Sequence, residues 1–237
     1  MTIPFQKGRY VARFATSAAD VTACHSLRHA AFFRRPGRDV DSFDADCRHL
    51  MVVGQTGRVV AVLRLWLLPD GTAANTGYTA QYYDLAGFAK ITEPVIELGR
   101  LCVAADVRDG DVLRVLWGAL TRLVDAENIT LLFGCTSFAG TDPHDYGRVF
   151  AQLAAFHLGP PDRCPKPRTP EAVAFAQLPA QGTRPLPSVL RSYLAMGAWV
   201  GDHVVVDRQM NTQHVFTCVD IAAVPPARAR ILRAIAS

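Results

Sequence analysis

The sequence predicts an α/β fold with a mixed, mostly antiparallel sheet flanked by helices. Short strand-like segments joined by tight turns come first, and a strand-helix-strand order follows in the middle of the chain. Hydrophobic residues make up 50% of the 237 positions, which is enough for a sizeable core.

The N-terminal third contains a strand, a helix and a hairpin. Residues 8–14 are strand-like, and Ser17 marks the start of a helix that reaches about Phe33 before Pro36-Gly37 ends it. An acidic loop at 39–46 follows. Residues 49–53 and 58–68 then form a hairpin across the turn at 54–57.

The middle of the chain alternates strands and helices. We expect strands at 94–103 and 129–136, and helices at 112–126 and 145–158.

The C-terminal third begins with a proline-rich segment, because eight of the fifteen prolines fall between Pro160 and Pro187. Proline disfavours both a continued helix and a central strand. We therefore predict an acyltransferase-sized core at 1–158, a linker or extended wrap at 159–187, and a C-terminal extension at 188–237 that completes the fold. Within that extension we expect a helix at 186–196, strands at 204–207 and 215–220, and a final basic helix from 226.

Composition narrows the setting of the protein. No apolar run approaches the length of a membrane span, since Arg64 interrupts the longest one, and the N-terminus lacks the apolar core of a secretion signal. We therefore expect a cytoplasmic protein. Residues 1–40 carry seven basic and two acidic side chains, which suits an acidic protein, an anionic lipid surface or nucleic acid, or is an ordinary solvated face.

The six cysteines contain no C-x-x-C pair, and the histidines lack metal-ligand spacing. We expect reduced thiols and no metal site.

Charged side chains inside apolar stretches mark the candidate site. Glu97 and Arg100 lie in one strand but differ in parity, so a regular strand would point them to opposite faces, and a bulge at Gly99 would bring them to one. A structural ion pair with other elements is the alternative.

Arg64 lies in the middle of an apolar strand, and we expect it to face a pocket. Arg28 lies at the edge of the first helix's apolar stripe, where it either joins this region or extends along the surface into solvent. Asp41, Phe43 and Asp44 belong to the acidic loop, which is either a solvated capping segment or a loop that closes over a site.

Four stretches together match a known pattern. They are Leu27-Arg28-x-x-x-Phe32, Asp41-x-Phe43-Asp44-x-x-Cys47-x-His49-Leu50, Glu97-Leu98-Gly99-Arg100-x-Cys102-Val103 and Phe133-Gly134-Cys135-Thr136-Ser137-Phe138. The series resembles the bacterial N-acyltransferases that catalyse the first step of ornithine lipid synthesis, and the likeness continues through residues 190–201 and 206–216. A more distant likeness is to acyl-homoserine-lactone synthases.

The resemblance implies a GNAT-like fold with the C-terminal extension packed on the sheet. It implies transfer of a fatty acyl group, often a 3-hydroxyacyl group, from acyl carrier protein to the α-amine of L-ornithine, which gives lyso-ornithine lipid. Transfer to glutamine or another amino acid, an acyl-homoserine-lactone synthase, and a non-catalytic module that binds the carrier or the membrane remain open. No cofactor is implied, because the acyl-phosphopantetheine of the carrier is the donor substrate.

The candidate roles divide into three groups. Glu97 is the candidate proton acceptor, and a backbone N–H between Arg100 and Cys102 is the candidate donor to the oxyanion. Substrate binding is assigned to Arg28, Phe32, Asp41, Phe43, Asp44, Arg64 and Ser137. The arginines suit the carboxylate of the acceptor, and the aspartates suit the side-chain ammonium of ornithine.

The turn at 108–113 bears on the donor. Val103, Arg108 and Gly110 are the candidate donor-binding residues. Coenzyme A enzymes of the GNAT type use a small-residue turn to hold a pyrophosphate, whereas Asp111 and Leu113 replace small residues in this turn. A carrier-bound phosphopantetheine has one phosphodiester and needs a weaker cradle. We expect acyl carrier protein as partner, transient contact with the inner membrane surface, and no nucleic acid.

Overall fold

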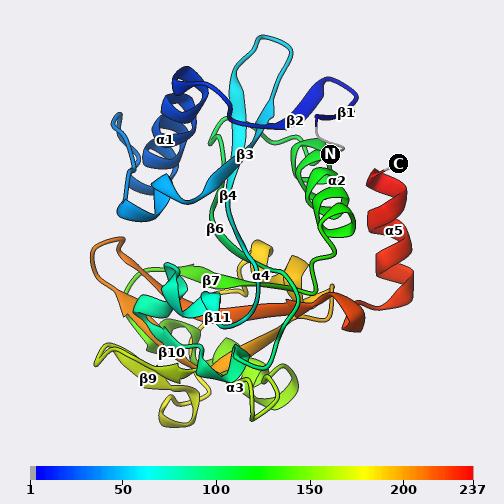
Figure 1. Ribbon diagram of the computed structural model, residues 1–237. Coiled ribbons are helices and arrows are strands. Elements are labelled where there is room, and N and C mark those ends of the chain that lie inside the picture. The colour runs from blue at the N-terminus through cyan, green and yellow to red at the C-terminus, as the bar shows by residue number, and fades with distance from the viewer. Residues whose placement is uncertain (1–3, 237) are drawn as a thin grey trace. The chain divides into compact units, whose positions relative to one another are not determined.

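The computed structural model describes residues 4–236 (Figure 1). They form two compact units. Unit 1 comprises the residues up to 67, residues 98–129 and those from 226 onward, and unit 2 comprises residues 68–97 and 130–225. Each unit combines mostly antiparallel strands with helices, which confirms the predicted α/β class. The expected boundaries at 158 and 187 stay predictions.

Unit 1 is built on a five-strand order, β1-β2-β3-β4-β6. The strands are β1 (Phe5–Lys7), β2 (Tyr10–Phe14), β3 (Arg48–Val53), β4 (Val59–Leu68) and β6 (Val95–Val103), and the helices are α1 (Ala18–Phe33), η1 (Ser42–Ala45), α2 (Asp111–Ala126) and α5 (Pro226–Ala236). The pairs from β1 to β4 are antiparallel. The chain of β6 begins in unit 2 and ends in unit 1.

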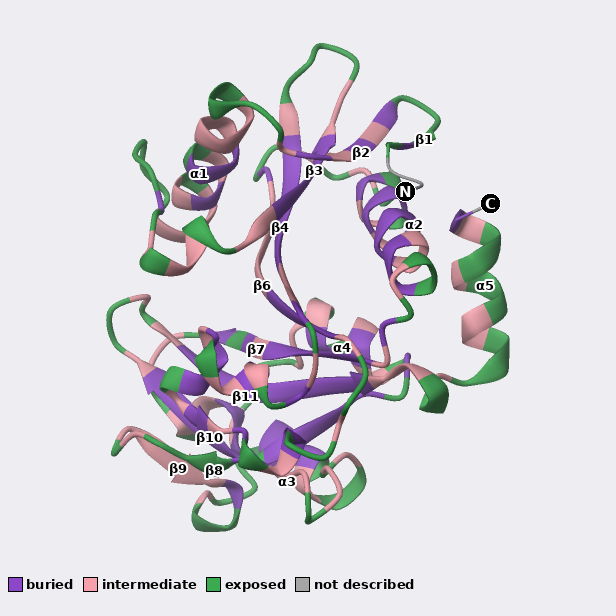
Figure 2. Cartoon of the chain, viewed as in Figure 1, coloured by how far each residue is buried: buried purple, intermediate pink, exposed green. Residues whose placement is uncertain are grey.

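Local sequence explains the helices of unit 1. Ser17 caps α1 and forms a capping box with Asp20, as a Ser-x-x-acid pattern favours. One face of α1 packs on a cluster of Cys24, Met51, Val62 and Cys102. α2 is buried along its length, whereas only Ala236 of α5 is buried, although the two helices lie side by side (Figure 2).

Unit 2 carries the strand order β7-β11-β10-β9. Its strands are β5 (Tyr83–Asp84), β7 (Leu131–Ala139), β8 (Lys166–Pro167), β9 (Ala172–Ala174), β10 (Trp199–Asp207) and β11 (Thr212–Asp220), and its helices are α3 (Gly147–Phe156), α4 (Ser188–Leu194), η2 (Ala73–Thr76), η3 (Thr79–Gln81), η4 (Ala86–Phe88), η5 (Pro143–Tyr146), η6 (Phe175–Gln177) and η7 (Ile221–Ala223). All of the pairs in this order are antiparallel.

Two hydrophobic clusters hold unit 2 together. One contains Phe138, Tyr146 and Phe150 with residues of α4, and it packs on one side of β7, β10 and β11. The other contains the aromatic rings of Phe88, Phe133, Trp199 and Phe216, most of them edge to face or tilted. The C-terminal extension therefore supplies two central strands, as expected.

Several element boundaries differ from the expectation. The first strand is shorter, because a turn at Gly8, which has a positive φ of 58°, separates β1 from β2. β7 begins at Leu131 and continues to Ala139 because it pairs with the whole of β11. α3 begins at Gly147, because Asp142 caps the preceding turn η5. In the proline-rich segment, β8 and β9 are only two and three residues long.

None of the helices within residues 4–236 is both long enough and apolar enough to span a bilayer. All six cysteines are free thiols, as predicted.

Candidate active site

Six alternating charges of unit 1 form a closed ring, which we call the charge ring. Its members are, in order, Arg28, Asp39, Arg100, Asp41, Arg64 and Asp44. Three guanidinium groups face three carboxylates, so the ring is electrically neutral as a whole. Each charge contacts two of the opposite sign, which lowers the cost of taking it out of water.

The contacts of Arg28 and Arg64 converge on Asp44. Nη1 of Arg28 donates to Oδ1 of Asp44 at 2.6 Å, and Nε of Arg28 donates to Oδ2 of Asp39 at 2.8 Å. Nη1 of Arg64 lies 2.6 Å from Oδ1 of Asp41 and 3.0 Å from Oδ1 of Asp44. Burial disfavours the Asp44 carboxylate, but its hydrogen bonds with these donors hold the pKa of Asp44 well below the usual range.

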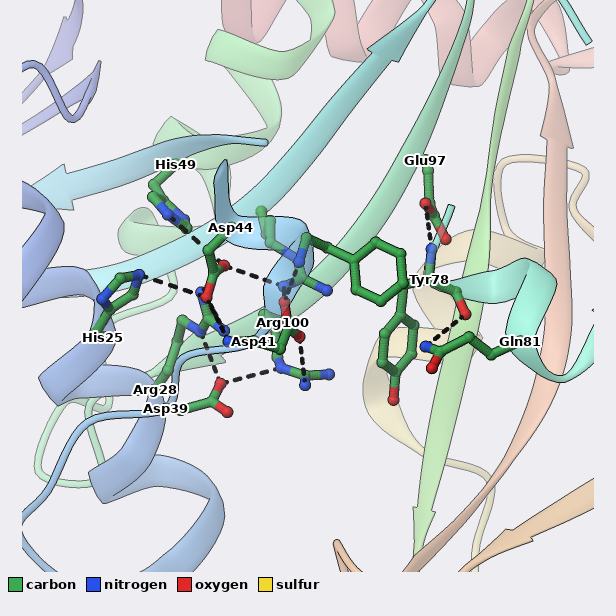
Figure 3. Close-up of polar contacts among 12 residues, drawn as sticks. His25, Arg28, Asp39, Asp41, Asp44, His49, Tyr78, Gln81, Glu97 and Arg100 are labelled. Carbon is green, nitrogen blue, oxygen red and sulfur yellow. Dashed lines mark hydrogen bonds and ion pairs between the residues drawn. The ribbon is translucent and has the colours of Figure 1, made fainter. Parts of the chain in front are cut away.

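The acidic loop folds on itself to present these carboxylates. Asp41 caps the short helix η1 by accepting from Phe43 N at 3.0 Å, and Asp44 accepts in return from Asp41 N at 3.0 Å. This reciprocal capping fixes both side chains before any arginine reaches them (Figure 3).

Arg100 closes the ring from β6. Its Nε donates to Oδ2 of Asp39 and its Nη2 donates to Oδ2 of Asp41, both at 3.0 Å. Its φ is +55°, which lies in the left-handed region that a non-glycine residue rarely adopts inside a strand. The irregularity expected at Gly99 is therefore centred on Arg100, where the two carboxylates compensate for the strain.

The ring is unevenly buried. The side chain of Arg28 is fully buried, that of Arg64 is 3% exposed and those of Asp44 and Asp39 are below 10%, whereas Arg100 is 12% and Asp41 23% exposed. The neighbouring members Arg100 and Asp41 are thus the edge of the ring that solvent reaches.

Two histidines adjoin Asp44. Nε2 of His25 lies 3.6 Å and Nε2 of His49 lies 3.8 Å from the Asp44 oxygens, and the three ligand atoms lie within 4.8 Å of one another. A cation placed between them would also face two guanidinium groups that already bind Asp44. Burial, followed by the charge of Arg28, lowers the pKa of His49 to about 4, so the ring opposes additional positive charge at this point.

Glu97 lies in unit 2, on the first half of β6, and its side chain is buried. Its Oε1 accepts from Thr79 N at 2.5 Å and its Oε2 from Tyr78 N at 3.1 Å (Figure 3). Two backbone donors stabilise the ionised carboxylate and fix its orientation. Gly77 permits this approach, since a Cβ at that position would stand 2.1 Å from Oε2 of Glu97.

The remaining predicted residues are distributed over both units. In unit 1, Phe32 packs against the cluster that contains Cys102, and Phe43 lies 6.2 Å from Trp66 between ring centroids. Burial raises the pKa of the Cys102 thiol to about 12, which keeps that side chain from acting as a thiolate. In unit 2, Ser137 is exposed on β7.

The turn before α2 holds an internal acid. Arg108 is exposed, and its Nη1 donates to Ala105 O at 2.5 Å. Asp109 accepts from Asp111 N at 2.9 Å, from Arg9 Nη2 at 2.6 Å and from Tyr10 at 3.2 Å. A carboxylate therefore occupies a backbone donor at the start of this helix, next to the candidate donor-binding residues Val103 and Gly110.

Sequence reasoning missed Asp39, His25, His49 and the backbone donors of residues 78–79. Asp39 had a detectable signal, because three arginines in apolar surroundings call for a third carboxylate besides Asp41 and Asp44. The backbone donors had none, since every residue except proline carries an N–H.

Comparisons with known proteins agree with this arrangement. Residues 25–118 match the acetyltransferase (GNAT) domain family. The chain is 32% identical to the L-ornithine N(alpha)-acyltransferase of Rhodobacter capsulatus over 90% of this chain and 91% of the relative. It is 28% identical to the L-ornithine N(alpha)-acyltransferase of Brucella abortus over 90% of this chain and 85% of the relative.

A solved structure shares the fold. FeeM, an N-acyl amino acid synthase from uncultured soil microbes, aligns at a TM-score of 0.54 with 10% identity, over 96% of this chain and 97% of FeeM. The motif resemblance is confirmed by the curated relatives, and the GNAT-like fold by the domain match and this structure. The chain is an acyltransferase that belongs to the L-ornithine N(alpha)-acyltransferase family.

Proposed function

We propose that this protein transfers a fatty acyl group from the thioester of acyl carrier protein to the α-amine of L-ornithine, giving lyso-ornithine lipid. Family membership supports the acceptor class. The observation that carries the chemistry is Glu97, a buried carboxylate that two backbone N–H groups hold in its ionised form. An ionised, oriented carboxylate is the form that accepts a proton from an ammonium group.

In the proposed reaction, Glu97 takes the proton from the α-ammonium group, directly or through a water molecule. The free amine attacks the thioester carbon, and a backbone N–H between Arg100 and Cys102 donates to the oxyanion that develops. The C–N bond forms, the C–S bond breaks, and the departing thiolate takes up a proton. The products are an amide and the free thiol of the carrier.

The exposed edge of the charge ring suits a zwitterionic acceptor. Arg100 offers a guanidinium to a carboxylate, and Asp41 offers a carboxylate to an ammonium group. Arg28, Arg64 and Asp44 are saturated by one another and buried, so we propose that they hold this edge in place. Arg100 lies three residues beyond Glu97 on β6, which limits how far apart the acceptor's two ends can be held.

The donor proposal rests on the turn before α2. Asp109 places negative charge at the backbone donors that a pyrophosphate would need. This supports a carrier-bound phosphopantetheine over coenzyme A. The product is a single-chain amphiphile, so we also propose that the enzyme works in the cytoplasm and makes transient contact with the inner membrane surface.

The test is a transfer assay with the purified protein. Long-chain acyl carrier protein thioesters are incubated with ornithine, with glutamine and with other amino acids, and the products are identified by mass spectrometry. N-acyl ornithine is the expected product, and acyl-coenzyme A should react much more slowly. Equal rates with both donors would remove the carrier-protein proposal, and acylation of glutamine alone would replace the acceptor.

Glu97→Gln tests the mechanism in the same assay. An amide cannot accept the ammonium proton, so turnover should fall by at least about a hundredfold. Glu93→Gln is the matched control, because Glu93 is an exposed glutamate four positions earlier. Near-normal activity of the Glu97 variant would exclude Glu97 from proton transfer.

A further inference from the structure

Unit 2 buries two histidines with unpartnered nitrogens in its aromatic core. His203 and His214 are each 2% exposed, and Nε2 of each has no hydrogen-bond partner. His214 lies on β11 among the rings of Tyr82 and Tyr83, at centroid distances of 4.8 and 5.6 Å. An unsatisfied polar atom in such surroundings is costly, which is the usual reason to look for a ligand or a bound water.

The hydrogen bonds of Tyr83 determine which form of His214 is present. The Tyr83 hydroxyl lies 3.0 Å from the His214 carbonyl oxygen and 3.0 Å from His214 Nδ1. Tyr83 has one proton, and donating it to the carbonyl satisfies both contacts only if Nδ1 of His214 carries a hydrogen. Burial lowers the pKa of His214 to about 4, so the ring is neutral at pH 7. Nε2 is then a bare acceptor.

This acceptor belongs to a face that leads back to Glu97. His214 pairs directly with the exposed Ser137 across β7 and β11, and their side chains share one face of the sheet. On the other side, the ring of Tyr82 lies 5.6 Å from that of Tyr78, whose N–H binds Glu97. Within unit 2, adjoining side chains thus connect the candidate base to an open strand residue by way of His214.

We infer that Nε2 of His214 accepts a hydrogen bond from a hydroxyl group near the thioester end of the acyl chain. The inference rests on the proposed function. A hydroxyl is a donor that a bare imidazole nitrogen lacks, whereas an unsubstituted chain brings only methylene groups and leaves that nitrogen unpaired. His214 therefore makes the enzyme select 3-hydroxyacyl donors over unsubstituted acyl donors of the same length.

The experiment measures kcat/KM for a 3-hydroxyacyl and an unsubstituted acyl carrier protein thioester of equal length. The wild-type protein should prefer the hydroxylated donor by about tenfold to a hundredfold. His214→Leu should bring the ratio close to one by slowing the hydroxylated donor alone. His214→Gln keeps an acceptor oxygen and should retain part of the preference. His144→Leu, at an exposed histidine of unit 2, should keep the full ratio.

Tyr83→Phe covers the case in which the leucine variant fails to fold, because it leaves His214 in place and removes only the hydroxyl that fixes its form. Its preference should fall several-fold, and an unchanged ratio would overturn the inference. A wild-type ratio near one would also overturn it, with a buried water as the partner of Nε2, while leaving the proposed function intact. If no donor acylates any amino acid, the proposed function itself fails.

Discussion

Neutralising one carboxylate of the charge ring is the sharpest test of the structure of unit 1. Asp44 accepts from Arg28 and Arg64 at 2.6 and 3.0 Å, and its side chain is only 7% exposed. Asp44→Asn leaves the ring with one uncompensated positive charge that water cannot reach. Removing one partner of a buried ion pair costs about 3–5 kcal/mol, so we expect a loss of that size in the free energy of unfolding.

The assay is urea unfolding at pH 7, followed by circular dichroism and by tryptophan fluorescence. Asp106→Asn is the control, because Asp106 binds Arg58 at 2.6 and 2.7 Å in the same unit but with both side chains more than half exposed. Water screens such a pair, so its loss should be too small to resolve. Equal effects of the two substitutions would show that burial does not determine the strength of these contacts. A stable Asp44→Asn protein would refute the ring.

Two further predictions concern pH and the environment of Glu97. The pKa of His49 falls from 6.5 in the unfolded chain to about 4 in the folded protein, so the unfolded state binds more protons between these values and stability decreases as pH falls. The free energy of unfolding should be about 1 kcal/mol lower at pH 5 than at pH 7 after allowing for screening, and His49→Gln should flatten this slope. An unchanged slope in that variant would assign the pH effect to other groups. Gly77→Ala should displace the Glu97 carboxylate and reduce turnover at least tenfold with the fold retained, whereas Gly110→Ala, whose Cβ meets nothing within 4 Å, should be active; full activity of the Gly77 variant would mean that the position of Glu97 is unimportant.

The parts of the structure that were predictable from sequence are those set by neighbouring residues. Helix α1 was expected to reach about Phe33 and ends there, because its cap and its apolar spacing are local signals. The hairpin of β3 and β4 was likewise predictable. Arg64 and Arg100 were identified because a guanidinium in an apolar strand needs a partner.

What could not be predicted depends on pairs distant in sequence. Asp39 binds Arg100 across 61 positions, and no local pattern announces that contact. A bulge was expected at Gly99 because glycine tolerates unusual backbone angles, yet Arg100 adopts the positive φ, since its side-chain bonds offset the strain. The carboxylate of Glu97 is held by backbone groups that carry no residue-specific signal.

The order in which unit 1 is assembled matters during synthesis. Helix α5 packs on α2 within this unit, where Arg233 binds Asp125 at 3.1 Å and Arg122 donates to Ala236 O at 2.5 Å. A ribosome makes residues 226–236 only after every residue of unit 2 has emerged. The strands made first therefore belong to the unit that is completed last, and the side of α2 that α5 covers has to be shielded by other means, such as a chaperone, until the last helix emerges.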